Sequence, residues 1–366
     1  MGAQAASVSR SRGASSSARR RSRAADLIAF RLPLSSVTTP QSQPAASADS
    51  ADTLGAIGEG AVLARIFPRL PAASAQLLGP GDDAAVVAAP DGRYVVTTDM
   101  MIHGPDFRLA WSTPHDLGFK AAASNLADVA AMGAVPTALV VAIAAPADSP
   151  VALLEGIADG LRDGCATLAP GCGVVGGDLS VSPTLTIAVT AFGDLEGRAP
   201  VLRSGAGVGD VIAVAGVLGE SAAALRLLFE QAVDADGVPD ARRAASLRAS
   251  TAAQLAPQPP IAAGPIAAIA GATAMLDLSD GLALDAGRMA SASGVGIDLD
   301  PLPTAEALYG GEDHSLLAAF PADAVIPGEF RVIGRVVAGS GVRVAGVPLT
   351  DAGGWDPYRE WDSAAG

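Results

Sequence analysis

From Leu54 onward, short apolar segments alternate with longer segments of helical character, and 42 Gly and 26 Pro separate them. This frequent punctuation excludes a coiled coil, and a hydrophobic content of 50% excludes global disorder. Strands that alternate with helices are typical of α/β folds. Because 366 residues exceed the usual size of one domain, we expect an α/β protein with two lobes of similar size.

The segments can be placed along the chain from their apolar periodicity. We expect helices over residues 60–70, 114–132, 151–168, 221–229 and 280–293, and strands over residues 94–98, 138–144, 185–192, 211–215 and 274–278. The helix from residue 114 has the clearest ends, since Thr113 is a good N-cap, Pro114 suits the first position and Gly133 follows. A Gly-rich hinge at 196–209 predicts domains over 53–197 and 198–366.

Residues 1–52 form a separate, Ala-, Ser- and Arg-rich segment without hydrophobic periodicity, which predicts a disordered tail. It is interpreted as a flexible tail or a start codon assigned too early, and the alternative is an organelle transit peptide. No apolar run is long enough to span a bilayer. Two cysteines, Cys165 and Cys172, exclude a disulfide framework and are expected to pack as small hydrophobes. We therefore expect a reduced, cytoplasmic protein.

The charge balance limits the ligands. The first fifty residues carry seven Arg and two Asp, while the whole chain carries −14, which leaves about −19 for the remainder. Such an acidic body argues against nucleic-acid binding. Lys120 is the sole lysine and lies in no Walker A motif, and no protein-kinase motif set is present. If the protein handles phosphates, divalent metal ions must supply most of the positive charge.

Several aspartates follow short apolar or Gly-rich segments: Asp82, Asp83, Asp99, Asp128, Asp178, Asp277 and Asp280. The Asp82-Asp83 pair also suits an ordinary turn, and Ser279 with Asp280 also suits a helix N-terminus. Asp128 is expected near the C-terminus of a helix, where the helix dipole disfavours an anion and a cation would compensate. Together with the Thr97, Thr98 and Ser279 hydroxyls, these hard oxygen atoms suit several Mg²⁺ ions that neutralise a triphosphate.

The other candidates carry less chemistry. Arg203 suits a phosphate contact or, alternatively, a surface position in the hinge. The histidines His103, His115 and His314 lack the spacing of a metal site, and each is interpreted as an ordinary surface or core residue.

Seven motifs in order, between about Leu54 and Trp361, resemble the thiamine-monophosphate kinase family of the aminoimidazole-ribonucleotide-synthetase-like superfamily. They are Gly81-Asp-Asp-Ala-Ala-Val-Val, Thr97-Thr-Asp-Met, the segment from Lys120 to Pro136, Gly176-Gly-Asp, Arg203-Ser-Gly-Ala, Asp277-Leu-Ser-Asp-Gly-Leu and Gly310-Gly-Glu-Asp. The resemblance implies ATP-dependent, Mg²⁺-assisted in-line phosphorylation of thiamine monophosphate to thiamine diphosphate. It also implies the two-domain fold of that superfamily, with an α/β C-terminal domain and an N-terminal sheet domain that joins a second copy in a shared barrel.

The resemblance also assigns roles to residues. Metal ligands would be Asp83, Thr97, Thr98, Asp99, Asp128, Asp178, Asp277 and Asp280, of which Asp128, Asp178 and Asp280 are the expected catalytic residues. ATP would contact Gly177, Asp178, Arg203 and Ser279. The thiamine part would contact Glu312 and Trp355. Because the acceptor is a phosphate oxygen, we expect no catalytic His or Lys and no phosphoenzyme.

The expected acceptor end differs from the family pattern. Asp106 stands where the family usually has a His near the substrate, so either Asp106 contacts the cationic thiamine or His103 substitutes. His314 replaces the usual Tyr, and Ala127 the usual Ser. Two alternatives stay open: another ATP-using enzyme of the superfamily, of the purine-pathway ligase type, or a non-catalytic protein that binds nucleotides or thiamine phosphates.

Overall fold

The computed structural model describes residues 52–80, 84–350 and 353, all within one compact unit. Among these residues, no helix is both long enough and apolar enough to cross a membrane. The predicted tail, apart from its last residue Asp52, lies outside the described residues, as do Asp82, Asp83 and Trp355.

Helices and strands alternate along the described chain, as the apolar pattern predicts. The helices are α1 (Leu54–Ile57), α2 (Glu59–Ile66), the 3₁₀ helix η1 (Phe67–Arg69), α3 (Pro114–Ala131), α4 (Val151–Leu168), α5 (Glu220–Gln231), α6 (Ala241–Leu255), α7 (Ala263–Ile269), α8 (Leu282–Ser293) and α9 (Ala305–Tyr309). The strands are β1 (Gln76–Leu78), β2 (Val86–Val87), β3 (Val95–Ile102), β4 (Val135–Ala145), β5 (Gly173–Val181), β6 (Thr186–Asp194), β7 (Val211–Ala215), β8 (Ala274–Leu278), β9 (Gly296–Leu299), β10 (Ser315–Phe320), β11 (Phe330–Val337), β12 (Gly341–Val344) and β13 (Val347–Pro348).

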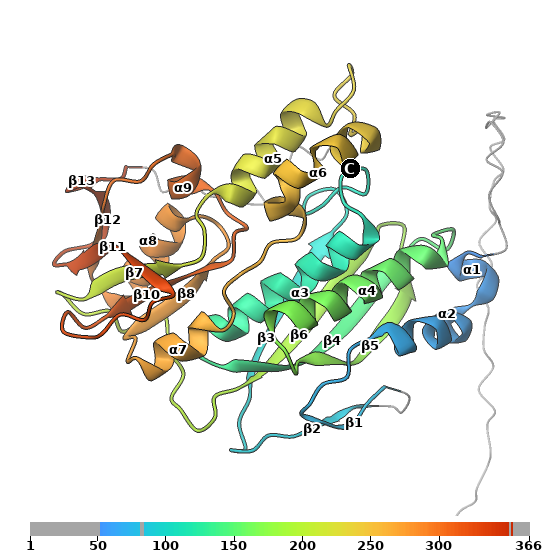
Figure 1. Ribbon diagram of the computed structural model, residues 1–366, viewed down its shortest axis with the longest axis horizontal. Coiled ribbons are helices and arrows are strands. Elements are labelled where there is room, and N and C mark those ends of the chain that lie inside the picture. The colour runs from blue at the N-terminus through green and yellow to red at the C-terminus, as the bar shows by residue number, and fades with distance from the viewer. Residues whose placement is uncertain (1–51, 81–83, 351–352, 354–366) are drawn as a thin grey trace, which may run out of the picture. The chain divides into compact units, whose positions relative to one another are not determined.

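A four-stranded sheet carries the first part of the chain, in the order β3-β6-β4-β5. The β3–β6 and β6–β4 pairs are antiparallel, whereas β4 and β5 are parallel and are joined through α4. Helices α3 and α4 lie side by side along this sheet, and α3 packs against β3, β4 and β6 (Figure 1). The side chains of β3 that point toward α3 are therefore brought against that helix.

Helix α3 is fixed at its start and along its length. Thr113 and Asp116 form a capping box, in which each side chain accepts a hydrogen bond from the other residue's backbone N–H. The α3–α4 contact is close because both helices carry glycine there. A Cβ atom added to Gly118 would lie 2.0 Å from the Ile157 carbonyl oxygen, and one added to Gly160 would lie 2.0 Å from the His115 carbonyl oxygen.

A second sheet, of seven described strands, follows in the order β13-β12-β9-β11-β7-β10-β8. Helix α8 packs on β8, β9 and β12. Strand β8 lies at one edge and pairs antiparallel with β10, so that Asp277 is opposite Leu316. Strand β10 therefore begins beside the end of β8, and this places residues 311–314, which precede β10, close to Asp277.

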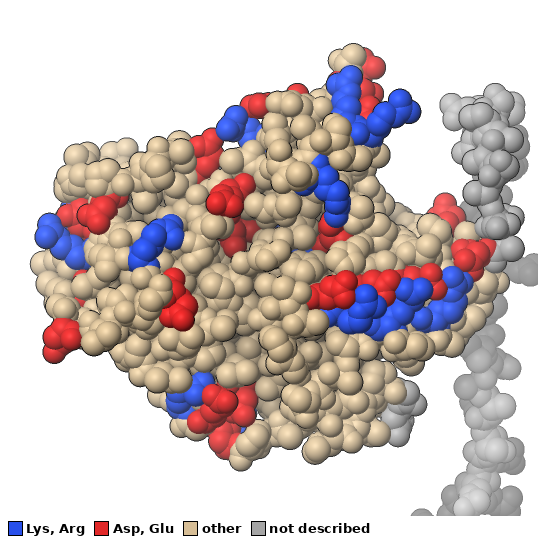
Figure 2. Space-filling model, viewed as in Figure 1, with Lys and Arg blue, Asp and Glu red and all other residues tan. Residues whose placement is uncertain are grey.

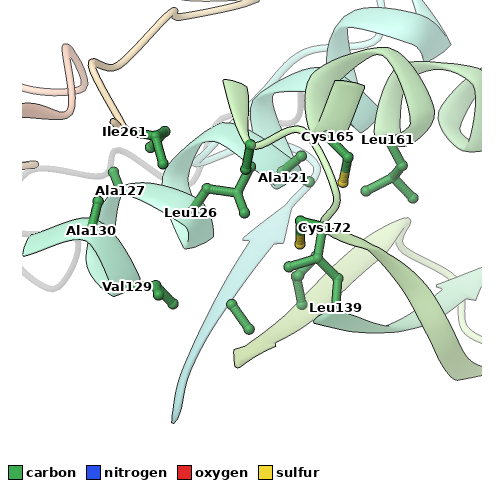
Figure 3. Packing of buried hydrophobic residues seen from close by; sticks show 14 of the residues in the cluster. Ala121, Leu126, Ala127, Val129, Ala130, Leu139, Leu161, Cys165, Cys172 and Ile261 are labelled. Carbon is green, nitrogen blue, oxygen red and sulfur yellow. The ribbon is translucent and has the colours of Figure 1, made fainter. Parts of the chain in front are cut away.

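The larger core cluster lies between the four-stranded sheet and helices α3 and α4, and it extends to residues of the second sheet. Cys165 and Cys172 are free and buried there, among side chains such as Leu126, Leu139 and Leu161 (Figure 3). The expectation that the cysteines pack as small hydrophobes is confirmed.

Charged side chains form a continuous network where α2 and η1 meet α4. Arg65 pairs with Glu155, and Arg69 and Arg162 both pair with Asp159. Figure 2 shows acidic and basic side chains in neighbouring rows over this region. These arginines are neutralised by α4, so they do not form a free basic surface.

Most sequence-predicted elements are confirmed, with three corrections. Strand β3 continues through Ile102 because it pairs with β6 along its whole length, so Asp99 lies inside the strand instead of after it. Asp178 likewise lies inside the edge strand β5 instead of at a strand end. Helix α8 starts only at Leu282, since Gly281 has a φ of 113°, and Ser279 and Asp280 therefore precede the helix. The boundary predicted at residue 198 falls between β6 and β7 and stays a prediction.

Candidate active site

Strand β3 and helix α3 hold the first part of the site together. Alternation along β3 places Thr97 and Asp99 on the face toward α3. Thr97 Oγ1 donates a hydrogen bond of 3.0 Å to Asp128 Oδ2, and the Asp99 backbone N–H donates one of 3.1 Å to Asn125 Oδ1. Asn125 lies about one turn before Asp128 on the same helix, so two α3 residues fix β3 at this point.

Four carboxylates, Asp99, Asp128, Asp277 and Asp280, lie close enough to affect one another and are called the acidic cluster here. Burial, together with the charges of Asp277 and Asp99, raises the pKa of Asp128 to about 7. Burial, together with Asp277 and Asp280, also raises the pKa of Asp99. The neighbouring carboxylates thus make Asp99 and Asp128 harder to ionise, and a bound cation would relieve this effect.

His314 is a part of this site that sequence reasoning missed. It is buried, and its Nδ1 lies 3.2 Å from Asp277 Oδ2. Although burial lowers it, the hydrogen bond and the charge of Asp277 raise the pKa of His314 above its usual value. Its φ of 52° is unusual for a residue with a side chain, and such strain concentrates at functional sites. The available signal was its place directly after Gly310-Gly-Glu-Asp, where the family pattern has Tyr.

Asp280 is drawn toward α8. Its Oδ2 accepts a hydrogen bond of 2.6 Å from Arg288 Nη1, which also contacts Asp285 Oδ1 at 2.6 Å. Burial raises the pKa of Asp285 to about 6, and the contacts with Arg288 and the Asp280 backbone N–H only partly offset it. Sequence reasoning missed both Arg288 and Asp285, whose three-residue spacing on a helix was the available signal.

Four of the other predicted metal and nucleotide residues, Thr98, Gly177, Asp178 and Arg203, are not part of this cluster. Thr98 is on the opposite face of β3, where its hydroxyl donates to the Val189 carbonyl oxygen at 2.9 Å. Gly177 and Asp178 line a largely apolar pocket of about 730 Å³ beside the edge strand β5. Arg203 lies in the loop before β7, where its carbonyl oxygen accepts from Ser293 Oγ at 3.3 Å.

A second pocket, of about 390 Å³, adjoins the acidic cluster and is called the Glu312 pocket here. It is lined by the predicted substrate residues Asp106 and Glu312 and by Ser279. Burial raises the pKa of Asp106, and the charges of Glu312 and Asp99 raise it further, while its carboxylate accepts a 2.7 Å hydrogen bond from the Ile102 backbone N–H. The pocket is therefore lined by the segment that follows β3 and by residues of α3, α5 and α6, and it carries two carboxylates.

Aromatic side chains close the far part of the Glu312 pocket. The Trp111 and Phe229 rings meet edge to face with centroids 5.0 Å apart, and the Arg108 guanidinium lies 4.6 Å and 4.7 Å from the two centroids. The Trp111 indole N–H donates to the Ala232 carbonyl oxygen at 2.9 Å. An aromatic pair that holds a delocalised cation provides the kind of surface on which a cationic heterocycle also binds.

The acidic cluster suits Mg²⁺ in its chemistry, since its ligands are hard oxygen atoms and since burial and neighbouring carboxylates raise the pKa values of Asp99 and Asp128. Within the described part of the chain, however, no three Asp, Glu, His or Cys side chains are arranged to hold one ion. The cluster therefore fits the metal in donor type and charge without forming a complete ligand shell, and Asp83, a predicted ligand, lies outside the described residues.

Comparison with known proteins identifies the family of this chain. Residues 81–195 match the family described as AIR synthase related protein, N-terminal domain. The thiamine-monophosphate kinase of Mycobacterium tuberculosis is 44% identical over 338 residues, which cover 86% of this chain and 96% of that protein. Crystal structures of the thiamine-monophosphate kinase from Stenotrophomonas maltophilia (30% identity, 79% and 96% coverage) and of AaThiL complexed with AMPPCP and TMP (32%, 75% and 90%) both give a TM-score of 0.63. The chain therefore belongs to the thiamine-monophosphate kinase family.

Proposed function

We propose that this protein transfers the γ-phosphoryl group of ATP to thiamine monophosphate and forms thiamine diphosphate, the last step of thiamine diphosphate biosynthesis. The observation that carries the proposal is the junction of the acidic cluster with the Glu312 pocket, in a chain closely related to kinases of this name. A metal-binding cluster beside a carboxylate-lined pocket suits a phosphorylated, cationic acceptor. The solved relative that carries AMPPCP, an ATP analogue, together with TMP supports the same pair of substrates.

Mg²⁺ would be held by Asp83, Thr97, Thr98, Asp99, Asp128, Asp178, Asp277 and Asp280, and ATP by Gly177, Asp178, Arg203 and Ser279. The metal supplies charge neutralisation for the triphosphate and for the transferring phosphoryl group. The chain's own contribution is positioning, with Asp128, Asp178 and Asp280 as the proposed catalytic residues. Thr97 and Asn125 support this proposal, because they fix Asp128 and the Asp99 backbone in place.

No general base is required, because a phosphate acceptor is largely deprotonated near neutral pH. The chain therefore needs only to align the acceptor oxygen with the γ-phosphorus atom and to exclude competing water. We expect direct transfer, and recovery of a phosphorylated enzyme after incubation with ATP would contradict it.

The thiamine part would lie in the Glu312 pocket. Asp106 and Glu312 face that pocket and would stabilise the positively charged thiazolium ring. Of the two alternatives at the edited motif, the pocket lining favours Asp106, because His103 is not among the residues around it. Trp355, the third proposed contact, lies outside the described residues.

We further propose a cytoplasmic homodimer in which the four-stranded sheets of two copies join in a shared barrel. The support is an apolar outer face on β3, where Val96 and Met100 are 60% and 57% exposed. The proposed domains remain 53–197 and 198–366. Light scattering coupled to size exclusion tests the assembly, and a monomer at micromolar concentration would contradict it.

The activity is tested by incubating the purified protein with ATP, Mg²⁺ and thiamine monophosphate and following thiamine diphosphate by chromatography. Free thiamine and an aminoimidazole-pathway substrate serve as parallel acceptors. Diphosphate formed only from the monophosphate is the expected result. Tight binding of Mg-ATP without any product would instead mean that the edited acceptor end serves another molecule.

A further inference from the structure

The sole lysine of the chain lies in the wall of the Glu312 pocket, although neither the motifs nor the proposed mechanism gives it a role. Lys120 is only 5% exposed, and its Nζ lies 3.0 Å from Glu312 Oε1. Both residues line the pocket. Burying a lysine costs free energy unless its ammonium group is paired with an anion. Glu312 is that anion here.

Glu312 is held at both carboxylate oxygens. Lys120 contacts Oε1, and Gln254 Nε2 donates a hydrogen bond to Oε2. Gln254 is itself fixed, because its Oε1 accepts from the Ser221 hydroxyl. The three elements that meet here are α3, α6 and the segment between α9 and β10. The carboxylate is thus locked in one place while about 35% of the Glu312 side chain stays accessible.

The backbone at Glu312 supports a functional purpose for this arrangement. Its φ is 66°, a left-handed conformation that residues with side chains rarely adopt. The Glu312 N–H donates to the Ser279 carbonyl oxygen at 2.8 Å, which ties the strained residue to the end of β8. Strain of this kind persists where the surroundings enforce it, and it concentrates at binding and catalytic sites.

Lys120 also affects the pKa of the Glu312 carboxylate. Although burial raises it, Lys120 and Gln254 together lower the pKa of Glu312 below its usual value. Asp106 is the other carboxylate of the pocket, and its pKa is raised by burial and by Glu312. The pocket therefore contains one carboxylate, Glu312, that Lys120 and Gln254 both contact and whose pKa they lower.

We propose that Lys120 is a positioning residue that holds the Glu312 carboxylate in one orientation, and that through Glu312 it makes the acceptor pocket selective for a positively charged ring. The inference rests on the proposed function, because it takes thiamine monophosphate as the acceptor. Lys120 itself need not touch the substrate.

The test compares binding of thiamine monophosphate with binding of an analogue whose ring nitrogen is replaced by carbon, so that the ring is neutral. Isothermal titration calorimetry gives both dissociation constants for the full-length protein, and their ratio measures selectivity for the cation. We expect Lys120→Met to lower the selectivity for the cation by about tenfold, mainly by weakening the binding of thiamine monophosphate. Lys120→Arg, which keeps the charge, should restore most of the ratio.

A double-mutant cycle separates action through Glu312 from direct contact. In a Glu312→Gln background, Lys120→Met should have almost no further effect on the ratio. The matched control is Arg248→Met, which removes another ion pair to α3, that with Asp116, but does not line the pocket. It should lower stability without changing the ratio.

Three outcomes would overturn the inference. The selectivity ratio could be unchanged in Lys120→Met, or Lys120→Met could change it equally in the unmodified and the Glu312→Gln backgrounds. The third is that Arg248→Met lowers the ratio as much as Lys120→Met does. Failure of the proposed function is seen separately, as absence of thiamine diphosphate formation by the unmodified protein. If product forms and the ratio is unaffected by Lys120→Met, only the inference fails.

Discussion

Two identical substitutions on helix α3 should change stability in opposite directions. Burial and the neighbouring aspartates raise the pKa of Asp128 to about 7. In contrast, the pKa of Asp116 is lowered, because contacts with Arg248 and Thr113 outweigh the effect of burial. In metal-free protein, the charge on Asp128 is therefore unfavourable and the charge on Asp116 is favourable.

The magnitude follows from the shifted pKa of Asp128. Its rise from 3.8 to about 7 corresponds to roughly 4 kcal/mol at about 1.4 kcal/mol per pH unit. The charge of Asp99, whose own pKa is also raised, contributes to this shift, so only part of the cost belongs to Asp128. We therefore expect Asp128→Asn to stabilise the metal-free protein by about 2 kcal/mol at pH 8. The gain should shrink as the pH falls below 7 and vanish below 3.8, where Asp128 is protonated in both states.

Asp116→Asn provides the matched control. It removes the negative charge and one of the two acceptor oxygen atoms, so the side chain can no longer accept from both Arg248 and the Thr113 backbone N–H as it does in the unmodified protein. Since Arg248 is about half exposed, we expect a loss of about 2 kcal/mol, less than for a fully buried pair.

Urea unfolding in EDTA at several pH values measures both variants, and the kinase assay follows in Mg²⁺. Asp128→Asn should abolish turnover while it raises stability, whereas Asp116→Asn should retain turnover. A less stable Asp128→Asn protein at pH 8 would refute the electrostatic reasoning. Turnover like that of the unmodified protein would remove Asp128 from the metal site.

Three further predictions concern the scaffold. Gly160→Ala should cost at least about 2 kcal/mol in urea unfolding, because the new Cβ would lie 2.0 Å from the His115 carbonyl oxygen and would force α3 and α4 apart; an unchanged midpoint would contradict the close packing. Phe320→Ala should lower the free energy of unfolding by about 3–5 kcal/mol, since Phe320 is fully buried. Thermal unfolding measures this loss, and a clearly smaller loss would mean that the core collapses around the cavity. Because the pKa of Asp116 is lowered, its charge stabilises the fold at pH values above 3.8, and this stabilisation should be lost as the pH falls through the folded-state pKa. In urea titrations at low pH, the free energy of unfolding of Asp116→Asn should therefore fall less steeply than that of the unmodified protein.

The sequence predicted much of the scaffold because its signals are local. Thr113, Pro114 and Gly133 mark the ends of α3 within two residues, and apolar runs locate β7 and β8. Its errors share one cause. Asp99 and Asp178 were placed at strand ends because they follow short apolar or Gly-rich segments, yet pairing with neighbouring strands carries β3 and β5 through both positions.

The sequence by itself determined the alternating α/β pattern, the family, the acidic residues suited to Mg²⁺ and the edited position Asp106. Only the tertiary structure decided which of these residues meet. It brings Asp99, Asp128 and Asp277 into one electrostatic cluster, and it assigns Glu312 to Lys120. The reason is physical: a motif specifies side-chain chemistry and local geometry. Distances between residues almost two hundred positions apart, in contrast, depend on how helices and sheets pack, and the pKa values depend on those distances.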